Sequence, residues 1–243
     1  MFFKTNLHFH TGDDPQDPIE YNTLEGINKA SELGFRALAI TCHEKFIWSN
    51  EYKEYASSKG IVLIPGIEIN IGERKGEKRH LIVLNCDKDV EQIETFGNLE
   101  EYKKERPQTF VLAPHPYYPS LHQRSSLMKY ADKYAHLFDA IEHSWFYSEY
   151  LNKNQKAIEL SKRKDLPLVS TSDTHFFDFL DTDYCVIEAE EETPESILNG
   201  IKQRRFENFT RPKRLFKEMF LSYSKFCLKR SYKKIRRVKY RNP

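Results

Sequence analysis

The residues best able to do chemistry in this chain are histidines and carboxylates beside short apolar runs. Six of the nine histidines lie there: His8, His10, His43, His80, His115 and His175. The carboxyl ends of strands in a parallel α/β barrel converge on one face, where active sites are built. A single histidine in such a place is more often structural, but six with the same placement predict a shared metal site. His80 precedes its apolar run, so its strand either runs opposite to its neighbours or begins earlier than the run.

The spacing of these residues also favours a metal site. His8 and His10 are separated by one residue, as are Asp173 and His175. In an extended strand, residues i and i+2 point to the same side, so the two members of each pair should project together. Glu68 ends the run IVLIPGIE, and a carboxylate can bridge two ions. Imidazole and carboxylate ligands together suit Zn, Mn or Fe.

The elements that must position these residues alternate along the chain. We expect strands at the apolar runs Thr5–Phe9, Leu38–Ile40, Ile61–Ile64, Leu81–Leu84, Phe110–Ala113, Asp139–Ile141 and Leu166–Val169. Segments with helical periodicity are Tyr21–Leu33, Glu51–Lys59, Ser125–Tyr134, Tyr147–Lys164 and Thr193–Gln203. This alternation predicts an α/β fold with a parallel sheet. About seven strands are more consistent with a barrel than with a five-stranded open sheet.

Charge divides the chain into two parts. From Arg204 to Pro243 there are 15 Lys and Arg residues against two Glu, a net charge of +13, and the preceding residues carry −11. This shift and Pro212 predict a domain of residues 1–205 and a basic tail or helix of residues 206–243. An acidic body suits a protein that concentrates cations, and a basic tail suits a polyanion, either nucleic acid or an anionic membrane surface. A solvated tail without a partner is an equal alternative.

Apolar residues in the tail recur at helical spacing, which favours a packing face over a membrane face: Leu215, Phe216, Met219, Phe220, Tyr223 and Phe226. No run approaches 18 apolar residues, so we expect no transmembrane segment. The start MFFKTNLHFH lacks the apolar core of a signal peptide, which predicts a cytoplasmic protein. The four cysteines fit no metal-binding or C-x-x-C pattern, and we expect reduced thiols.

Separated motifs over roughly residues 4–190 resemble the PHP family, the polymerase and histidinol phosphatase domain. They are Asn6-Leu7-His8-Phe9-His10-Thr11, Thr41-Cys42-His43-Glu44, Pro65-Gly66-Ile67-Glu68 with the later His80, Ala113-Pro114-His115-Pro116, and Ser172-Asp173-Thr174-His175. The resemblance implies a distorted seven-stranded (β/α) barrel of PHP type with a basic C-terminal helical tail. It also implies a metal-dependent phosphoesterase.

The resemblance further implies two or three divalent metal ions. The ligands would be His8, His10, Glu68 and Asp173 for the first ion, Glu68, His80 and His115 for the second, and His43, His175 and Asp14 for the third. Asp13 and Asp17 are alternatives to Asp14. Asn6 and Cys42 stand where the family has Asp, at positions that we take to orient histidines. Asn6 can still accept a hydrogen bond from an imidazole, but Cys42 is a poorer acceptor and puts the third ion in question.

The leading expectation is a phosphatase that hydrolyses a small phosphomonoester with metal-activated water. No separate protein nucleophile is expected, because the sequence contains neither a G-x-S-x-G elbow nor a P-loop. Substrate contacts would come from the loops Tyr117–Arg124 and His143–Tyr147, in which Arg124 is either a phosphate clamp or a solvated side chain. The alternatives are a phosphodiesterase or nuclease that uses the basic tail, and a non-catalytic metal-binding regulatory module.

Overall fold

The computed structural model describes residues 1–117, 126–221, 224 and 227–228. Within these residues the strands form two five-stranded sheets. The first sheet has the order β10-β9-β1-β2-β3, and its strands are β1 Phe2–Phe9, β2 Ala37–Ile40, β3 Val62–Ile64, β9 Tyr184–Glu188 and β10 Phe206–Phe209. The second has the order β4-β5-β6-β7-β8, and its strands are β4 Gly66–Ile71, β5 Arg79–Leu84, β6 Phe110–Ala113, β7 Ala140–His143 and β8 Leu168–Ser170.

The expected fold is confirmed as α/β, but the seven-stranded barrel is not seen among the described strands. The chain passes from the first sheet to the second at Pro65, between β3 and β4. Proline has no amide hydrogen for a ladder, so a strand is easily interrupted there. β4, β5 and β6 then pair antiparallel in succession, and β9 pairs antiparallel with β1. These pairings replace the uniform parallel order that a β/α barrel requires.

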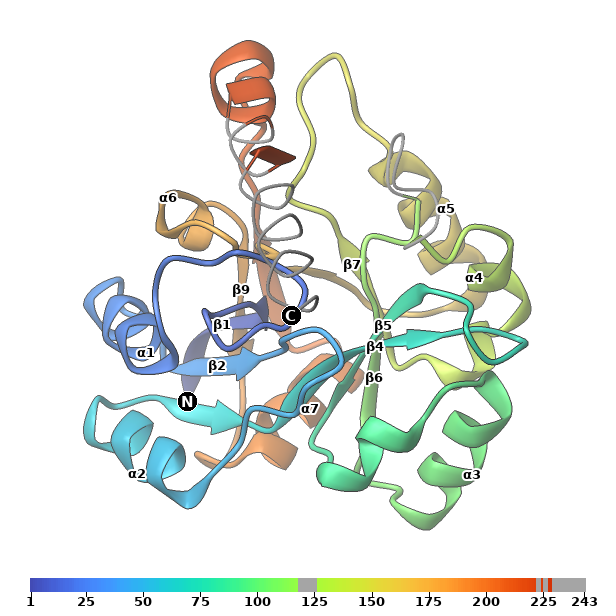
Figure 1. Ribbon diagram of the computed structural model, residues 1–243, viewed down its shortest axis with the longest axis horizontal. Coiled ribbons are helices and arrows are strands. Elements are labelled where there is room, and N and C mark those ends of the chain that lie inside the picture. The colour runs from blue at the N-terminus through green and yellow to red at the C-terminus, as the bar shows by residue number, and fades with distance from the viewer. Residues whose placement is uncertain (118–125, 222–223, 225–226, 229–243) are drawn as a thin grey trace, which may run out of the picture.

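Seven α-helices occur in the described part of the chain: α1 Thr23–Glu32, α2 Asn50–Ser58, α3 Phe96–Glu105, α4 Lys129–Lys133, α5 Asn154–Lys164, α6 Phe177–Leu180 and α7 Pro194–Lys202. Short 3₁₀ turns cover Lys88–Gln92 and Ala135–Leu137. Figure 1 shows α1 and α2 beside the first sheet and α3, α4 and α5 beside the second. The helix expected from Tyr147 begins only at Asn154, so residues 147–153 form a loop.

β1 is the central strand of the first sheet, and its end is fixed by tight packing. Phe9 is fully buried, and its ring lies against α1 at Gly26. A Cβ added at Gly26 would lie 2.7 Å from Phe9 Cε1, so a larger side chain would push the end of β1 away. The capping box of Asn22 and Glu25 fixes where α1 begins. The packing of Phe9 against α1 therefore helps to hold the strand end that carries His8.

The C-terminal part of the described chain is joined to the first sheet. β10 pairs antiparallel with β9, and Lys213 beyond it is buried against Asp183. The boundary expected between residues 205 and 206 therefore precedes a strand of this sheet. A π-helical turn, Leu215–Phe220, follows. No helix in the described residues is both long and apolar enough to cross a membrane.

Candidate metal centre

The nine residues expected as ligands come from both sheets. They are His8 at the end of β1, His10 and Asp14 after it, His43 after β2, Glu68 in β4, His80 in β5, His115 after β6, and Asp173 and His175 after β8. Two isolated parallel bridges, Phe9 with Thr174 and His43 with Glu68, connect these segments. β5 runs antiparallel to its neighbours, so the first explanation for the position of His80 is confirmed.

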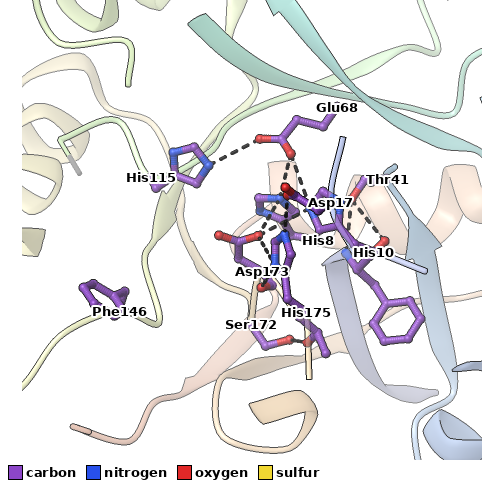
Figure 2. A network of polar contacts seen from close by, with 12 residues as sticks. His8, His10, Asp17, Thr41, Glu68, His115, Phe146, Ser172, Asp173 and His175 are labelled. Carbon is purple, nitrogen blue, oxygen red and sulfur yellow. Dashed lines mark hydrogen bonds and ion pairs between the residues drawn. The ribbon is translucent and has the colours of Figure 1, made fainter. Parts of the chain in front are cut away.

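Glu68 lies in the middle of the cluster and is almost completely buried. Its Oε1 atom is 2.7 Å from His80 Nδ1 and 3.3 Å from His115 Nε2. Its Oε2 atom is 3.3 Å from the Nε2 atoms of both His8 and His10 and 3.1 Å from His43 Nε2. Figure 2 shows imidazoles on either side of this carboxylate. Each oxygen of Glu68 thus faces a different set of histidines.

His8 and His10 are held in the same manner. The Nε2 atoms of both rings face the cluster, at 3.2 Å and 3.4 Å from Asp173 Oδ1. Their Nδ1 atoms contact other carboxylates, Glu142 for His8 at 3.0 Å and Asp14 for His10 at 2.9 Å. A carboxylate that accepts from Nδ1–H leaves the lone pair on Nε2 for a metal and fixes the orientation of the ring.

The three aspartates of the loop after β1 lie in different places. Asp14 Oδ2 accepts from the His43 backbone N–H and contacts His43 Nδ1, both at 2.8 Å, in addition to His10. Asp17 Oδ2 lies 3.0 Å from His175 Nε2 and 3.7 Å from His43 Nδ1. Asp13 instead accepts from the Thr23 hydroxyl. Asp14 is thus placed to orient two histidines, and Asp17 is near both histidines that the resemblance assigns to a third ion.

The sequence reasoning missed Glu142, a fully buried residue of β7. Asn6 was expected to contact an imidazole, but its side chain accepts from the His8 backbone N–H and donates to Ser172. Glu142 makes the imidazole contact instead. The available signal was its place directly after the apolar run Asp139–Ile141, the same placement that identified the other carboxylates.

Cys42 does not contact His43 as its place in the second motif suggested. Its buried sulfur lies 3.5 Å from the Thr11 hydroxyl, and burial raises the pKa of the thiol to about 11. Asp14 supplies the acceptor for His43. The substitution of Cys for Asp at this position therefore leaves His43 oriented. All four cysteines are free thiols.

The donor set fits divalent metal ions. His10 Nε2 and Glu68 Oε1 are buried and make no hydrogen bond in the described part of the chain. Four groups of three ligand atoms each lie within 4.8 Å of one another: His8, Glu68 and His115; His8, His10 and Asp173; His10, Asp14 and His43; and His43, Glu68 and His80. In the described residues Glu68 and Asp173 form ion pairs only with histidines. Converging atoms without aligned hydrogen bonds are what a bound cation would satisfy.

The pKa values of the histidines and of Glu68 show how strongly the charges of the cluster interact. Burial by itself lowers the pKa of His8, but the nearby carboxylates Asp173, Glu142 and Glu68 outweigh it and raise that pKa to about 10. Burial raises the pKa of Glu68, but the surrounding histidines hold it well below its ordinary value. Burial lowers the pKa of His80 to about 4, despite the attraction of Glu68. The carboxylates thus favour the protonated form of His8, His10, His43 and His115 over the neutral form.

The loops expected to contact substrate are described in part. Arg124 and residues 118–123 lie outside the described residues. Phe146 lies to one side of the cluster in Figure 2. A small cavity beside the cluster is lined by His115, Pro116, Tyr117, Ser144, Phe146, Lys153, Asn154 and Ala157. Its walls are mainly apolar, and Lys153 provides a positive charge.

A two-sheet α/β fold that gathers histidines and carboxylates into a buried cluster has the ligand types with which metal-dependent hydrolases hold their ions. The family model for the PHP domain matches residues 6–206. The chain therefore belongs to the PHP domain family of metal-dependent phosphoesterases, as its motifs predicted. No curated protein matches it.

Solved structures share the fold. A two-domain protein from Bacteroides vulgatus containing a predicted PHP-like metal-dependent phosphoesterase has a TM-score of 0.65 at 19% identity, covering 86% of this chain and 65% of that protein. PsfC from Pseudomonas syringae has a TM-score of 0.60 at 13% identity, and the match covers 95% of this chain and 99% of PsfC. The lesion-specific endonuclease PfuEndoQ from Pyrococcus furiosus has a TM-score of 0.59 at 15% identity, and the match covers 84% of this chain and 56% of the endonuclease. This chain thus spans less than two thirds of the first and third proteins, and these identities establish the fold alone.

Proposed function

We propose that the protein hydrolyses the phosphoester of a small molecule, using two or three divalent metal ions held by the cluster around Glu68. The observation that carries this proposal is the division of Glu68, with one oxygen facing His80 and His115 and the other facing His8 and His10. A carboxylate with ligand sets on both sides is placed to bridge two ions. Imidazole with carboxylate suits Zn, Mn or Fe.

The residues assigned to each ion follow these contacts. The first ion would be held by His8, His10, Glu68 and Asp173, the second by Glu68, His80 and His115, and the third by His43, His175 and an aspartate. For that aspartate we favour Asp17, because its Oδ2 lies 3.0 Å from His175 Nε2, whereas Asp14 lies against the Nδ1 atoms of His10 and His43. This assignment retains Asp14 as the group that orients two ligands.

The metals would supply water activation and neutralise charge on the phosphoryl oxygens. The protein contributes the orientation of the imidazoles and the burial of the cluster, which strengthens electrostatic interactions there. No other nucleophile is required.

A second candidate, a phosphodiesterase or nuclease, is favoured by one specific observation. The segment from Arg204 to Pro243 carries a net charge of +13, which suits a polyanion such as nucleic acid or an anionic membrane surface. The fold is also that of PfuEndoQ, which its name describes as an endonuclease. Binding through phosphate contacts releases counterions, so affinity for an oligonucleotide would then fall steeply with salt.

One experiment tests both candidates. Metal content is measured in protein prepared without chelator, and hydrolysis is screened over sugar phosphates, amino-alcohol phosphates, phosphotyrosine peptides, nucleotides and single- and double-stranded oligonucleotides. We expect at least two ions per chain and turnover of a phosphomonoester with weak dependence on salt. Cleavage of oligonucleotides alone would favour the nuclease. Protein with fewer than two ions that added Mn, Zn or Fe cannot restore, and with no hydrolysis, would favour a non-catalytic module.

A further inference from the structure

The feature that carries a further inference is the side chain of Glu142, which receives hydrogen bonds from three separate segments. Oε1 accepts from the Thr171 hydroxyl and contacts His8 Nδ1 at 3.0 Å. Oε2 accepts from the backbone N–H of His115. The residue is fully buried, and its partners lie after β8, in β1 and after β6.

A carboxylate is the side chain that such a set of partners requires. An ionised Glu accepts hydrogen bonds on both oxygens and donates none, so it suits donors on both sides. In the metal-loaded state, where His8 is neutral, its contact with Glu142 places the proton on Nδ1. The lone pair of His8 is then on Nε2, the atom that faces Glu68 and Asp173.

The second oxygen acts on the backbone that presents another histidine. His115 has φ +26°, a conformation that costs free energy in a residue other than glycine. The backbone N–H of His115 donates a hydrogen bond to Glu142, and the ring Nε2 of His115 faces Glu68 Oε1. A hydrogen bond from a carboxylate to this N–H helps to hold the strained backbone in place.

We propose that Glu142 is a positioning residue that fixes ligands of two metal ions at once. It sets the tautomer and ring orientation of His8 for the first ion and the backbone of His115 for the second. This inference rests on the proposed metal site, and it adds a coupling: loss of one buried carboxylate weakens both ions together.

A matched control lies at the other end of the same strands. Asp139, directly before β7, accepts from the Val111 backbone N–H in β6 at 2.8 Å and from Lys103 Nζ at 2.8 Å. It thus joins the segments of β6 and β7 as Glu142 does, but it contacts no residue of the cluster in the described part of the chain. Neutralising Asp139 should cost stability without acting on the metals.

The test compares Glu142→Gln with Asp139→Asn in the full chain, stripped of metal and titrated with Mn²⁺ and with Zn²⁺. Glutamine has one acceptor oxygen and one NH₂ donor. Whichever way its amide turns, the NH₂ group meets either the His115 N–H or the His8 and Thr171 donors. If it meets His8, the imidazole must move its proton to Nε2, where it blocks the metal. We expect Glu142→Gln to lose about 10–100-fold in affinity at two ions, and Asp139→Asn to titrate like the wild type.

Wild-type affinity in Glu142→Gln, or equal losses in the two variants, would overturn the positioning role. A measurement without a variant covers the case in which Glu142→Gln does not fold. In Zn²⁺-loaded wild-type protein, long-range ¹⁵N NMR should show the His8 proton on Nδ1, and a proton on Nε2 would overturn the proposal. Wild-type protein that binds metal without hydrolysing any phosphoester would reject the proposed activity alone. Wild-type protein that binds no metal would reject the activity and the role of Glu142 together.

Discussion

The metal centre and the Lys213–Asp183 ion pair both bury charged groups, but the two regions are completed differently. Lys213 and Asp183 contact each other directly, both side chains are fully buried, and Lys213 Nζ also donates to the Arg211 carbonyl at 2.7 Å. Each charge there meets an opposite charge of the same chain. In the metal centre, Glu68 and Asp173 meet only imidazoles among the described residues.

The pKa shifts express this difference. Burial lowers the pKa of Lys213 and raises that of Asp183, so even with a partner the environment disfavours both charges. In the cluster the carboxylates outweigh burial and raise the pKa values of His8, His10, His43 and His115. The charges of Lys213 and Asp183 therefore balance each other, whereas the carboxylates of the metal centre raise the pKa values of the histidines that surround them.

The largest expected effect is the loss of the bridging carboxylate. Glu68→Ala should lower kcat by orders of magnitude and remove at least one bound ion, because two ligand sets lose their shared member. His8→Ala and Asp173→Asn should act in the same direction. Steady-state kinetics and metal analysis on each variant measure this effect.

The control for that experiment is His136→Ala, which changes an exposed histidine outside the cluster. It should retain the activity and metal content of the wild type. Equal losses in Glu68→Ala and His136→Ala would show that the cluster is not the catalytic site.

The next effect concerns stability at the ion pair. Lys213→Met leaves a buried carboxylate without its cation and should lower the free energy of unfolding by about 3–5 kcal/mol. The double variant Lys213→Met/Asp183→Leu should recover much of that loss, because no buried charge remains. Urea denaturation of the metal-free proteins measures both, with the exposed Lys217→Met as the control. A double variant no more stable than the single one would contradict this account.

The position of Lys213 also bears on the basic tail. A chain shortened to end at Arg214 keeps Lys213 and should hydrolyse a small phosphoester at the wild-type rate while losing affinity for oligonucleotides or anionic liposomes. A chain that ends at Phe209 lacks the partner of Asp183 and should melt earlier. If the chain that ends at Arg214 bound oligonucleotides and anionic liposomes as tightly as the full chain, the proposed role of the tail would be wrong.

A smaller effect should appear with pH in metal-free protein. The pKa of His8 is raised from 6.5 to about 10, so the stability it contributes is complete below pH 6.5 and is lost as the pH rises toward 10. The melting temperature should therefore fall between pH 7 and pH 10. Added Zn²⁺ should reduce this fall, because the metal replaces the protons. Calorimetry with and without metal tests this, and a melting temperature that rises over the same interval would contradict it.

The smallest effect is expected at Cys42. Because Asp14 already accepts from His43 Nδ1, Cys42→Ala should leave metal affinity unchanged. Cys42→Asp should not raise affinity at the third ion, contrary to what the family motif alone suggests. Calorimetric titration with Mn²⁺ distinguishes these outcomes. A tighter third ion in Cys42→Asp would show that this position tunes His43 after all.

The sequence by itself determined seven of the ten described strands and most of the chemical groups of the cluster. The period of two in a strand placed His8 with His10 on one side, and the apolar runs located β1, β2, β3, β5, β6, β7 and β8 to within a few residues. Such local signals depend on neighbours along the chain. The grouping of Glu68 with His8, His10, His80 and His115 followed from the motif resemblance, and the structure adds His43.

Only the tertiary structure decided how strands pair and which distant groups meet. β4, β9 and β10 were missed, and their antiparallel pairing turned the expected barrel into two sheets. Glu142 contacts His8 across 134 positions, and Lys213 contacts Asp183 across 30. Pairing of this kind depends on long-range packing of the whole chain, and no local period in the sequence encodes it.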